Sequence, residues 1–187
     1  MLTLLAWPLT LDGLDRLEQP DLVAFVGQDE RPLGGLAGLC DWRLCGSLSR
    51  QVKAGAWGGA AGEAVLTVPA GRIAPGRLFL FGLGRKAPAS PDELGTLLRG
   101  SFSAVQKAGG GELATSLPGP FGEPQARALV GAAVDAKLSR VVLLAADPKA
   151  AHAALEAAAK DQRGVTVLAD ASSKGSLALR AGTPVLR

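Results

Sequence analysis

The sequence is poor in aromatic and metal-binding side chains. Its 187 residues include no tyrosine, five phenylalanines and three tryptophans, so aromatic residues make up only 4% of the chain. Bases are commonly bound by stacking on aromatic rings, and this composition disfavours a site of that kind. One histidine and two cysteines are too few for a zinc site made of these residue types. The acidic residues occur in pairs that turns and helix caps explain. We therefore expect no metal and no cofactor.

The sequence also lacks the pattern of a nucleophilic hydrolase. No GxSxG motif occurs, and the only histidine, His152, is expected on the surface of a helix with no carboxylate or cysteine at ligand spacing. A serine or cysteine nucleophile needs a neighbouring base to activate it. The sequence therefore predicts no machinery for nucleophilic catalysis.

Long apolar runs and clustered charges are missing as well. No run approaches the length of a membrane span, and the N-terminal segment MLTLLAWPLTLDG lacks the cationic start of a signal peptide. Cys40 and Cys45 fall on different faces of one expected helix, so no internal disulfide is predicted. The net charge of +3 comes from scattered cations, which disfavours nucleic acid as a partner. We expect a cytoplasmic protein with reduced thiols and no membrane contact.

Apolar runs alternate with amphipathic segments along the chain, a pattern typical of α/β proteins. We predict one three-layer α/β/α domain over residues 1–187, with a mixed, largely parallel sheet covered on both faces. Residues 9–19 are either extended or a short helix, and residues 176–187 could form a last edge strand. The expected strands are 2–7, 21–27, 64–69, 77–84, 112–117, 140–146 and 164–169, and the expected helices are 33–52, 91–108, 123–137 and 148–162.

The run RLFLFGLGRK, residues 77–86, is the segment around which we expect the sheet to be built. Its apolar residues end at Gly82 and Gly84, and Arg85 and Lys86 follow. Open α/β sheets bind ligands at the carboxyl ends of their strands, where backbone amides and cations can receive an anion. The spacing is not a dinucleotide fingerprint, because the next helix begins six residues later. We predict Gly82, Gly84, Arg85 and Lys86 as ligand-binding residues; in the alternative, the glycines only let the chain turn off the sheet.

A second glycine-rich segment, AGAWGGAAGE at residues 54–63, surrounds Trp57. Trp57 could cover a ligand or stack against it, and we include it among the predicted ligand-binding residues. In the alternative, Trp57 anchors this loop to the body of the domain.

Four segments in this order resemble the N-terminal domain of the cytosolic leucyl aminopeptidases, peptidase family M17. They are DLVAFVG at 21–27, LCDWRLCGSLSR at 39–50, AGAWGGAAGEAVLTVP at 54–69 and RLFLFGLGRK at 77–86. The expected helix at 91–108 follows in the expected place, and beyond about residue 110 the resemblance is in the order of elements only. The resemblance implies a macro-like α/β/α fold, in agreement with the alternation of strands and helices.

In that family the two metal ions and the catalytic lysine and arginine belong to a separate C-terminal domain, which an NTDAEGR motif marks. The present sequence contains no such motif and ends where we expect that domain to begin. The resemblance therefore carries over no catalytic and no metal-binding residue. It implies a non-catalytic, stand-alone relative that acts as a binding, assembly or regulatory module, in a homo-oligomer or with a separate catalytic subunit.

Two other functions stay open from the sequence. The first is a macro-domain-like binder or hydrolase of ADP-ribose or a related nucleotide, which would use the FGLGRK turn and the Trp57 loop. The second is a DNA-binding accessory domain, as in some bacterial members of the family, which the modest positive charge permits.

Overall fold

A computed structural model describes residues 1–160 and 162–169 of the protein. Seven strands form one sheet in the order β3-β4-β2-β5-β6-β1-β7. The pair of β3 and β4 is antiparallel and all other neighbours are parallel, which confirms the mixed, largely parallel sheet. The strands are β1 (Leu2–Pro8), β2 (Asp21–Gly27), β3 (Ala64–Thr67), β4 (Arg77–Gly84), β5 (Glu112–Thr115), β6 (Arg140–Ala145) and β7 (Val165–Leu168).

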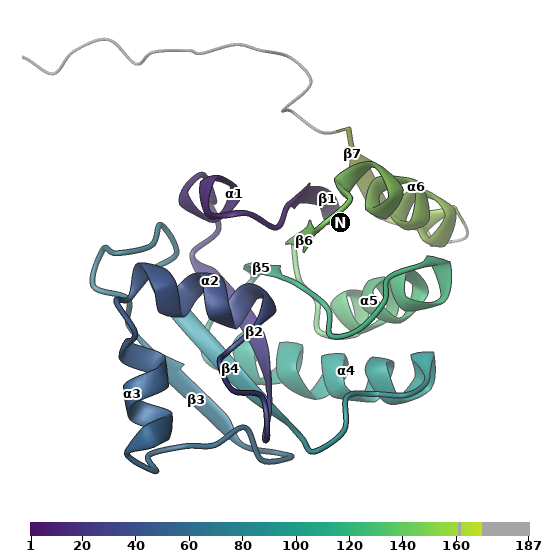
Figure 1. The fold of residues 1–187 in the computed structure, drawn as a ribbon. Helices are drawn as coiled ribbons and strands as arrows, with labels where there is room; N and C mark the ends of the chain where they lie inside the picture. The colour runs from purple at the N-terminus through teal and green to yellow at the C-terminus, as the bar shows by residue number, and fades with distance from the viewer. Residues whose placement is uncertain (161, 170–187) are drawn as a thin grey trace, which may run out of the picture.

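Helices cover both faces of this sheet (Figure 1). On one face α4, α5 and α6 pack over the length of the sheet around Leu98, Phe102 and Leu129, which are fully buried. The other face carries α1, α2 and α3, and its core lies mainly over β2 and β4. The helices are α1 (Leu11–Asp15), α2 (Gly35–Arg43), α3 (Ser47–Lys53), α4 (Pro91–Lys107), α5 (Glu123–Asp135) and α6 (Pro148–Ala159).

Two helices begin as their sequences predict. The Ser90 hydroxyl accepts the backbone N–H of Glu93 at 3.2 Å, with Pro91 at the first helical position of α4. The Glu93 carboxylate reaches back to the N–H of Ala89 at 2.8 Å, one residue before the Ser90 cap. Asp147 caps α6 in the same way, by accepting the N–H groups of residues 149 and 150.

The expected single helix over residues 33–52 is wrong, because the chain breaks it into α2 and α3. Cys45 and Gly46 lie in the left-handed region, with φ of 53° and 75°, so the helix cannot continue through them. The Asp41 carboxylate stabilises the break by accepting the N–H groups of Leu48 and Ser49 at the start of α3. Cys40 and Cys45 are therefore not in one helix, although both are free thiols as predicted.

The position of β4 also differs from the expectation. Residues 77–84 form a strand that is buried on both faces, but β4 lies next to the edge strand β3, and β5 is the middle strand. Residues 11–15, which the sequence left open, form the short helix α1, which the Thr10 side chain caps. The last strand expected within residues 176–187 lies outside the described residues.

A charged pair joins β2 to β4 at their amino ends. Asp21 has no exposed surface, and its two carboxylate oxygens accept hydrogen bonds from Nε and Nη2 of Arg77 at 2.6 and 2.7 Å. Arg77 also donates to the carbonyl of Ala108. The hydrogen-bonded Asp21 raises the pKa of Arg77, so this guanidinium stays charged. Within residues 1–160 and 162–169, no helix is long and apolar enough to cross a membrane.

Candidate functional site

The carboxyl ends of β2, β4 and β5 meet at one edge of the sheet, where parallel α/β sheets bind their ligands. A pocket of about 310 Å³ opens there, between the loop that follows β2 and the loop that follows β5. Its wall includes Phe25 of β2 and Leu83 of β4. The other residues that line it are Glu30, Gly34, Gly35, Leu36, Ala87, Ser116, Leu117, Pro118 and Gly119.

The two glycines predicted to bind a ligand lie beside this pocket, with their amides already paired. The N–H of Gly82 donates to the carbonyl of Glu63 at 2.8 Å, and that of Gly84 donates to the carbonyl of Gly59 at 2.9 Å. A Cβ at Gly82 would lie 2.0 Å from the carbonyl oxygen of Ala60. Glycine is therefore needed at position 82 because a neighbouring backbone packs against it, and neither amide is open to an anion.

Trp57 belongs to the same packed loop. Its side chain is only 5% exposed, and its indole N–H donates to the side-chain oxygen of Gln51 in α3 at 3.2 Å. The structure thus places Trp57 in the core between the sheet and α3, in the position of an anchor.

Arg85 and Lys86 extend beyond the glycine turn and are exposed. Arg85 approaches Asp29 at 4.0 Å, and both side chains are more than 70% exposed, so solvent screens their attraction. Lys86 lines a shallow hollow of about 570 Å³ that shares Leu83 and Ala87 with the pocket. The predicted set is therefore not brought together: the glycines and Trp57 are packed inside, and the two cations lie at the rim.

The sequence interpretation missed Glu30, which lines the pocket. One oxygen of its carboxylate accepts the N–H of Gly27 at 3.1 Å, and the other accepts the N–H of Gly34 at 3.0 Å. Gly34 is the N-cap of α2, so this carboxylate occupies the helix N-terminus at which an α/β protein commonly receives a phosphate. The signal in the sequence was an acidic residue between a buried strand and the glycine pair at 34–35.

A second carboxylate fills an amide nest in the loop before β3. One oxygen of Glu63 accepts the N–H groups of Gly58, Gly59 and Ala60 at 2.9, 2.7 and 3.1 Å. Hydrogen bonds to the charged form favour it, and these bonds, the one from Gly58 foremost, lower the pKa of Glu63 below its ordinary value of 4.5. Three backbone amides that could have bound an external anion are thus held by the chain's own carboxylate.

Cys40 and His152 do not line this pocket. Burial, with the nearby charge of Asp41, raises the pKa of the Cys40 thiol to about 12, so this cysteine stays protonated. His152 is not the surface residue we expected: its side chain is 24% exposed, and its Nε2 lies 3.3 Å from Glu156 one helical turn away. Among residues 1–160 and 162–169, no three histidine, cysteine, aspartate or glutamate side chains cluster so that they could hold a metal ion.

Comparison with solved structures agrees with this macro-like architecture. A mutant of tomato leucine aminopeptidase matches 84% of this chain with a TM-score of 0.58 and 16% identity, and the chain spans about a third of its length, 35%. A Trypanosoma brucei macrodomain in complex with ADP-ribose matches 82% of this chain and 68% of its own, with a TM-score of 0.63 and 15% identity. The macrodomain of Thermus aquaticus DarG matches 78% of this chain and 98% of its own, with a TM-score of 0.58 and 16% identity. At these identities the likeness shows the fold.

Sequence comparison identifies the family. No curated protein sequence matches the chain. The family profile of the cytosol aminopeptidase family, N-terminal domain, matches residues 22–140, which is more than half of the chain. The match spans β2 to the start of β6, including the loops that form the pocket. The chain therefore belongs to the cytosol aminopeptidase family, of which it carries the N-terminal domain.

Proposed function

We propose that this domain is a non-catalytic module that acts through binding and assembly. The observation that carries the proposal is the position of Glu30. Its carboxylate holds the N–H groups of Gly27 and Gly34 at the edge of the sheet where a ligand phosphate would need them. A phosphate at that helix terminus would have to displace Glu30 or lie next to a like charge, which disfavours it.

Three other carboxylates support the same proposal, because each accepts hydrogen bonds from backbone N–H groups. Glu63 accepts N–H groups of the loop at 58–60, Asp41 accepts N–H groups at the start of α3, and Glu93 accepts the N–H of Ala89 just before α4. Such groups bind backbone amides in the folded chain and are poorly placed to move protons to or from a substrate.

The exposed surface supports assembly of this domain with a second copy of itself. The strongly exposed large apolar side chains include Trp42 of α2 at 70%, Leu66 of β3 at 52% and Val68 at 71%. The last two lie at or next to the edge strand β3, and unprotected edge strands commonly pair with other chains. Sedimentation velocity over a range of concentrations tests this, with the variant L66K as the comparison. Wild-type protein that stays monomeric would leave a separate catalytic subunit as the assembly partner.

Binding or hydrolysis of ADP-ribose or a related nucleotide is the alternative. It is favoured by the pocket at the carboxyl edge of the sheet and by the T. brucei macrodomain, which was solved with ADP-ribose. A ligand that binds the folded state raises its melting temperature by mass action. We expect no shift with millimolar ADP-ribose, whereas the T. brucei macrodomain, as the positive control, should shift. A saturable shift of this protein would replace our proposal with the alternative.

The non-catalytic part of the proposal has a direct assay. The full chain is incubated with leucine p-nitroanilide and added Mn²⁺ or Zn²⁺, and we expect no release of nitroaniline above the blank. Release that scales with the metal and persists after removal of host peptidases would contradict it.

A further inference from the structure

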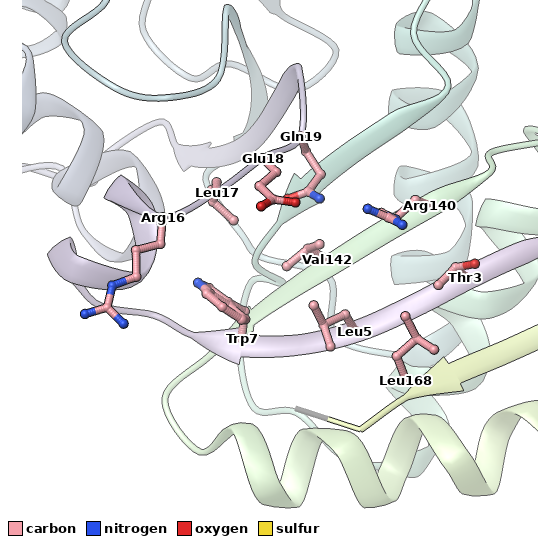
Figure 2. A pocket seen from close by; sticks show the side chains of 10 residues that line it. All are labelled: Thr3, Leu5, Trp7, Arg16, Leu17, Glu18, Gln19, Arg140, Val142 and Leu168. Carbon is pink, nitrogen blue, oxygen red and sulfur yellow. The ribbon is translucent and has the colours of Figure 1, made fainter. Parts of the chain in front are cut away.

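The α1 side of the sheet is only partly covered, and this leaves a second pocket far from the edge described above. The side chains of Leu5, Trp7, Val142 and Leu168, from β1, β6 and β7, form its apolar floor (Figure 2). Leu5 and Trp7 are only half-buried, because the short helix α1 covers this part of the face incompletely. The volume of about 180 Å³ is below the roughly 300–1,000 Å³ typical of sites for drug-sized ligands, so a ligand here must be small.

Gln19 gives this pocket a polar group that has no partner among the described residues. It lies in the connection between α1 and β2, and only 5% of the residue is exposed. Its amide makes no hydrogen bond with them, and Figure 2 shows this amide directed into the pocket. Its N–H groups and its oxygen are therefore available to a ligand in the pocket.

Two opposite charges stand near this amide. The guanidinium of Arg140 points from β6 toward Gln19, and the carboxylate of Glu18 lies beside the amide (Figure 2). Arg140 and Glu18 form no ion pair with a described residue, whereas Arg16 at the pocket rim is paired with Asp12 at 3.0 Å. A plain carboxylic acid would meet the like charge of Glu18, and a plain amine would meet that of Arg140.

We propose that this pocket binds a free α-amino acid with an apolar side chain. The carboxylate of the ligand would pair with Arg140 and with the amide N–H of Gln19. Its ammonium group would donate to Glu18 and to the amide oxygen of Gln19, and its side chain would lie on Leu5 and Trp7. This inference does not depend on the function proposed for the opposite part of the sheet.

NMR of the full-length protein labelled with ¹⁵N tests the ligand chemistry. The indole N–H of Trp7 donates to the carbonyl of Gly13 at 2.9 Å and gives an assignable resonance next to the pocket. We expect a saturable shift of this resonance with millimolar L-leucine. Isocaproate lacks the amine, isoamylamine lacks the carboxylate and glycine lacks the side chain. Each should therefore bind at least about tenfold more weakly than leucine. Equal binding of leucine and isocaproate, or no response to leucine, would overturn the proposal.

Two variants and a control test the named residues. R140M should weaken leucine binding about tenfold or more, because it removes the partner of the carboxylate. Q19L should weaken it likewise, because it removes the amide that would pair with both charged groups of the ligand. R99M, on α4 across the sheet, should bind leucine as the wild type does. A leucine response that persists in both pocket variants, or is lost equally in R99M, would show that the ligand does not bind here.

Discussion

At the scale of single residues, acidic side chains stabilise this fold by accepting hydrogen bonds from backbone N–H groups and from an arginine. The clearest pair is Asp21 with Arg77, in which the carboxylate is fully buried while the guanidinium side chain is 31% exposed. The two partners are therefore not equivalent. Removing the arginine leaves a buried charge, whereas removing the aspartate leaves a charge that water can still reach.

This asymmetry predicts unequal effects on stability. R77L should lower the free energy of unfolding by about 3 kcal/mol or more, because the Asp21 carboxylate stays buried without a partner. D21N should cost less, about 1–2 kcal/mol, since it keeps the shape and part of the hydrogen bonding. Urea unfolding of the full chain measures both, and R16L, in the exposed pair with Asp12, serves as a control with a cost below about 1 kcal/mol. A larger loss in D21N than in R77L would contradict this account.

The Glu63 nest predicts a dependence of stability on pH. Its amides lower the pKa of Glu63 in the folded state, so folding favours the charged form. This contribution is fully present above the unfolded pKa of about 4.5 and is lost as the pH falls through the lower folded value. The wild type should therefore be more stable than E63Q at neutral pH, and the difference should shrink below pH 4.5. Urea midpoints of both proteins along a pH series measure it, and a difference that does not change with pH would contradict the assignment.

At the scale of elements, the sequence predicted strands and capped helices well because their signals are local. The start of α4 follows from Ser90, Pro91 and Glu93, and the strands follow from short apolar runs. The break between α2 and α3 was missed because apolar residues recur at the helical spacing of four on both sides of it, at positions 36, 40, 44, 48 and 52. Gly46 and the side chain of Asp41 cause the break, and the contact of Asp41 with α3 appears only in three dimensions.

The candidate site was harder to predict for the same reason. A glycine at the end of a buried strand looks the same in sequence whether a ligand or another backbone fills the space above it. In this protein the backbone at residues 59–60 fills that space at Gly82. The sequence shows that position 82 excludes a side chain, but only the fold shows what lies against it.

Packing of the 59–61 backbone on β4 predicts a strong effect of one added methyl group. G82A should lower the free energy of unfolding by about 3 kcal/mol or more, because its Cβ would lie 2.0 Å from the carbonyl oxygen of Ala60. G100A is the matched control, since a Cβ at Gly100 on the exposed face of α4 would meet nothing within 4 Å. It should be neutral or stabilising by up to about 1 kcal/mol. Urea unfolding compares the two, and a G82A protein as stable as wild type would mean that residues 59–61 do not pack on this strand.

At the scale of the whole molecule, the two faces of the sheet are covered unequally. The helices α4, α5 and α6 bury one face from β4 to β1, whereas the other is well covered over β2 and β4 and only partly over β1 (Figure 1). Adjacent residues of β1 show the difference. Leu4 points into the core beneath α6 and has no exposed surface, while Leu5 points to the other face and is half-buried.

This unequal covering predicts that neighbouring substitutions in β1 differ in cost. L4A should lower the free energy of unfolding by about 3 kcal/mol, because it loses buried apolar surface and leaves a cavity in a packed core. L5A should cost about 1 kcal/mol or less, because water already reaches this side chain and no closed cavity forms. Urea unfolding of the full-length variants measures both, with unchanged m-values showing that unfolding still exposes the same surface. Equal costs would show that a further layer covers Leu5 in solution, and the pocket beside Trp7 would then be closed to a free ligand.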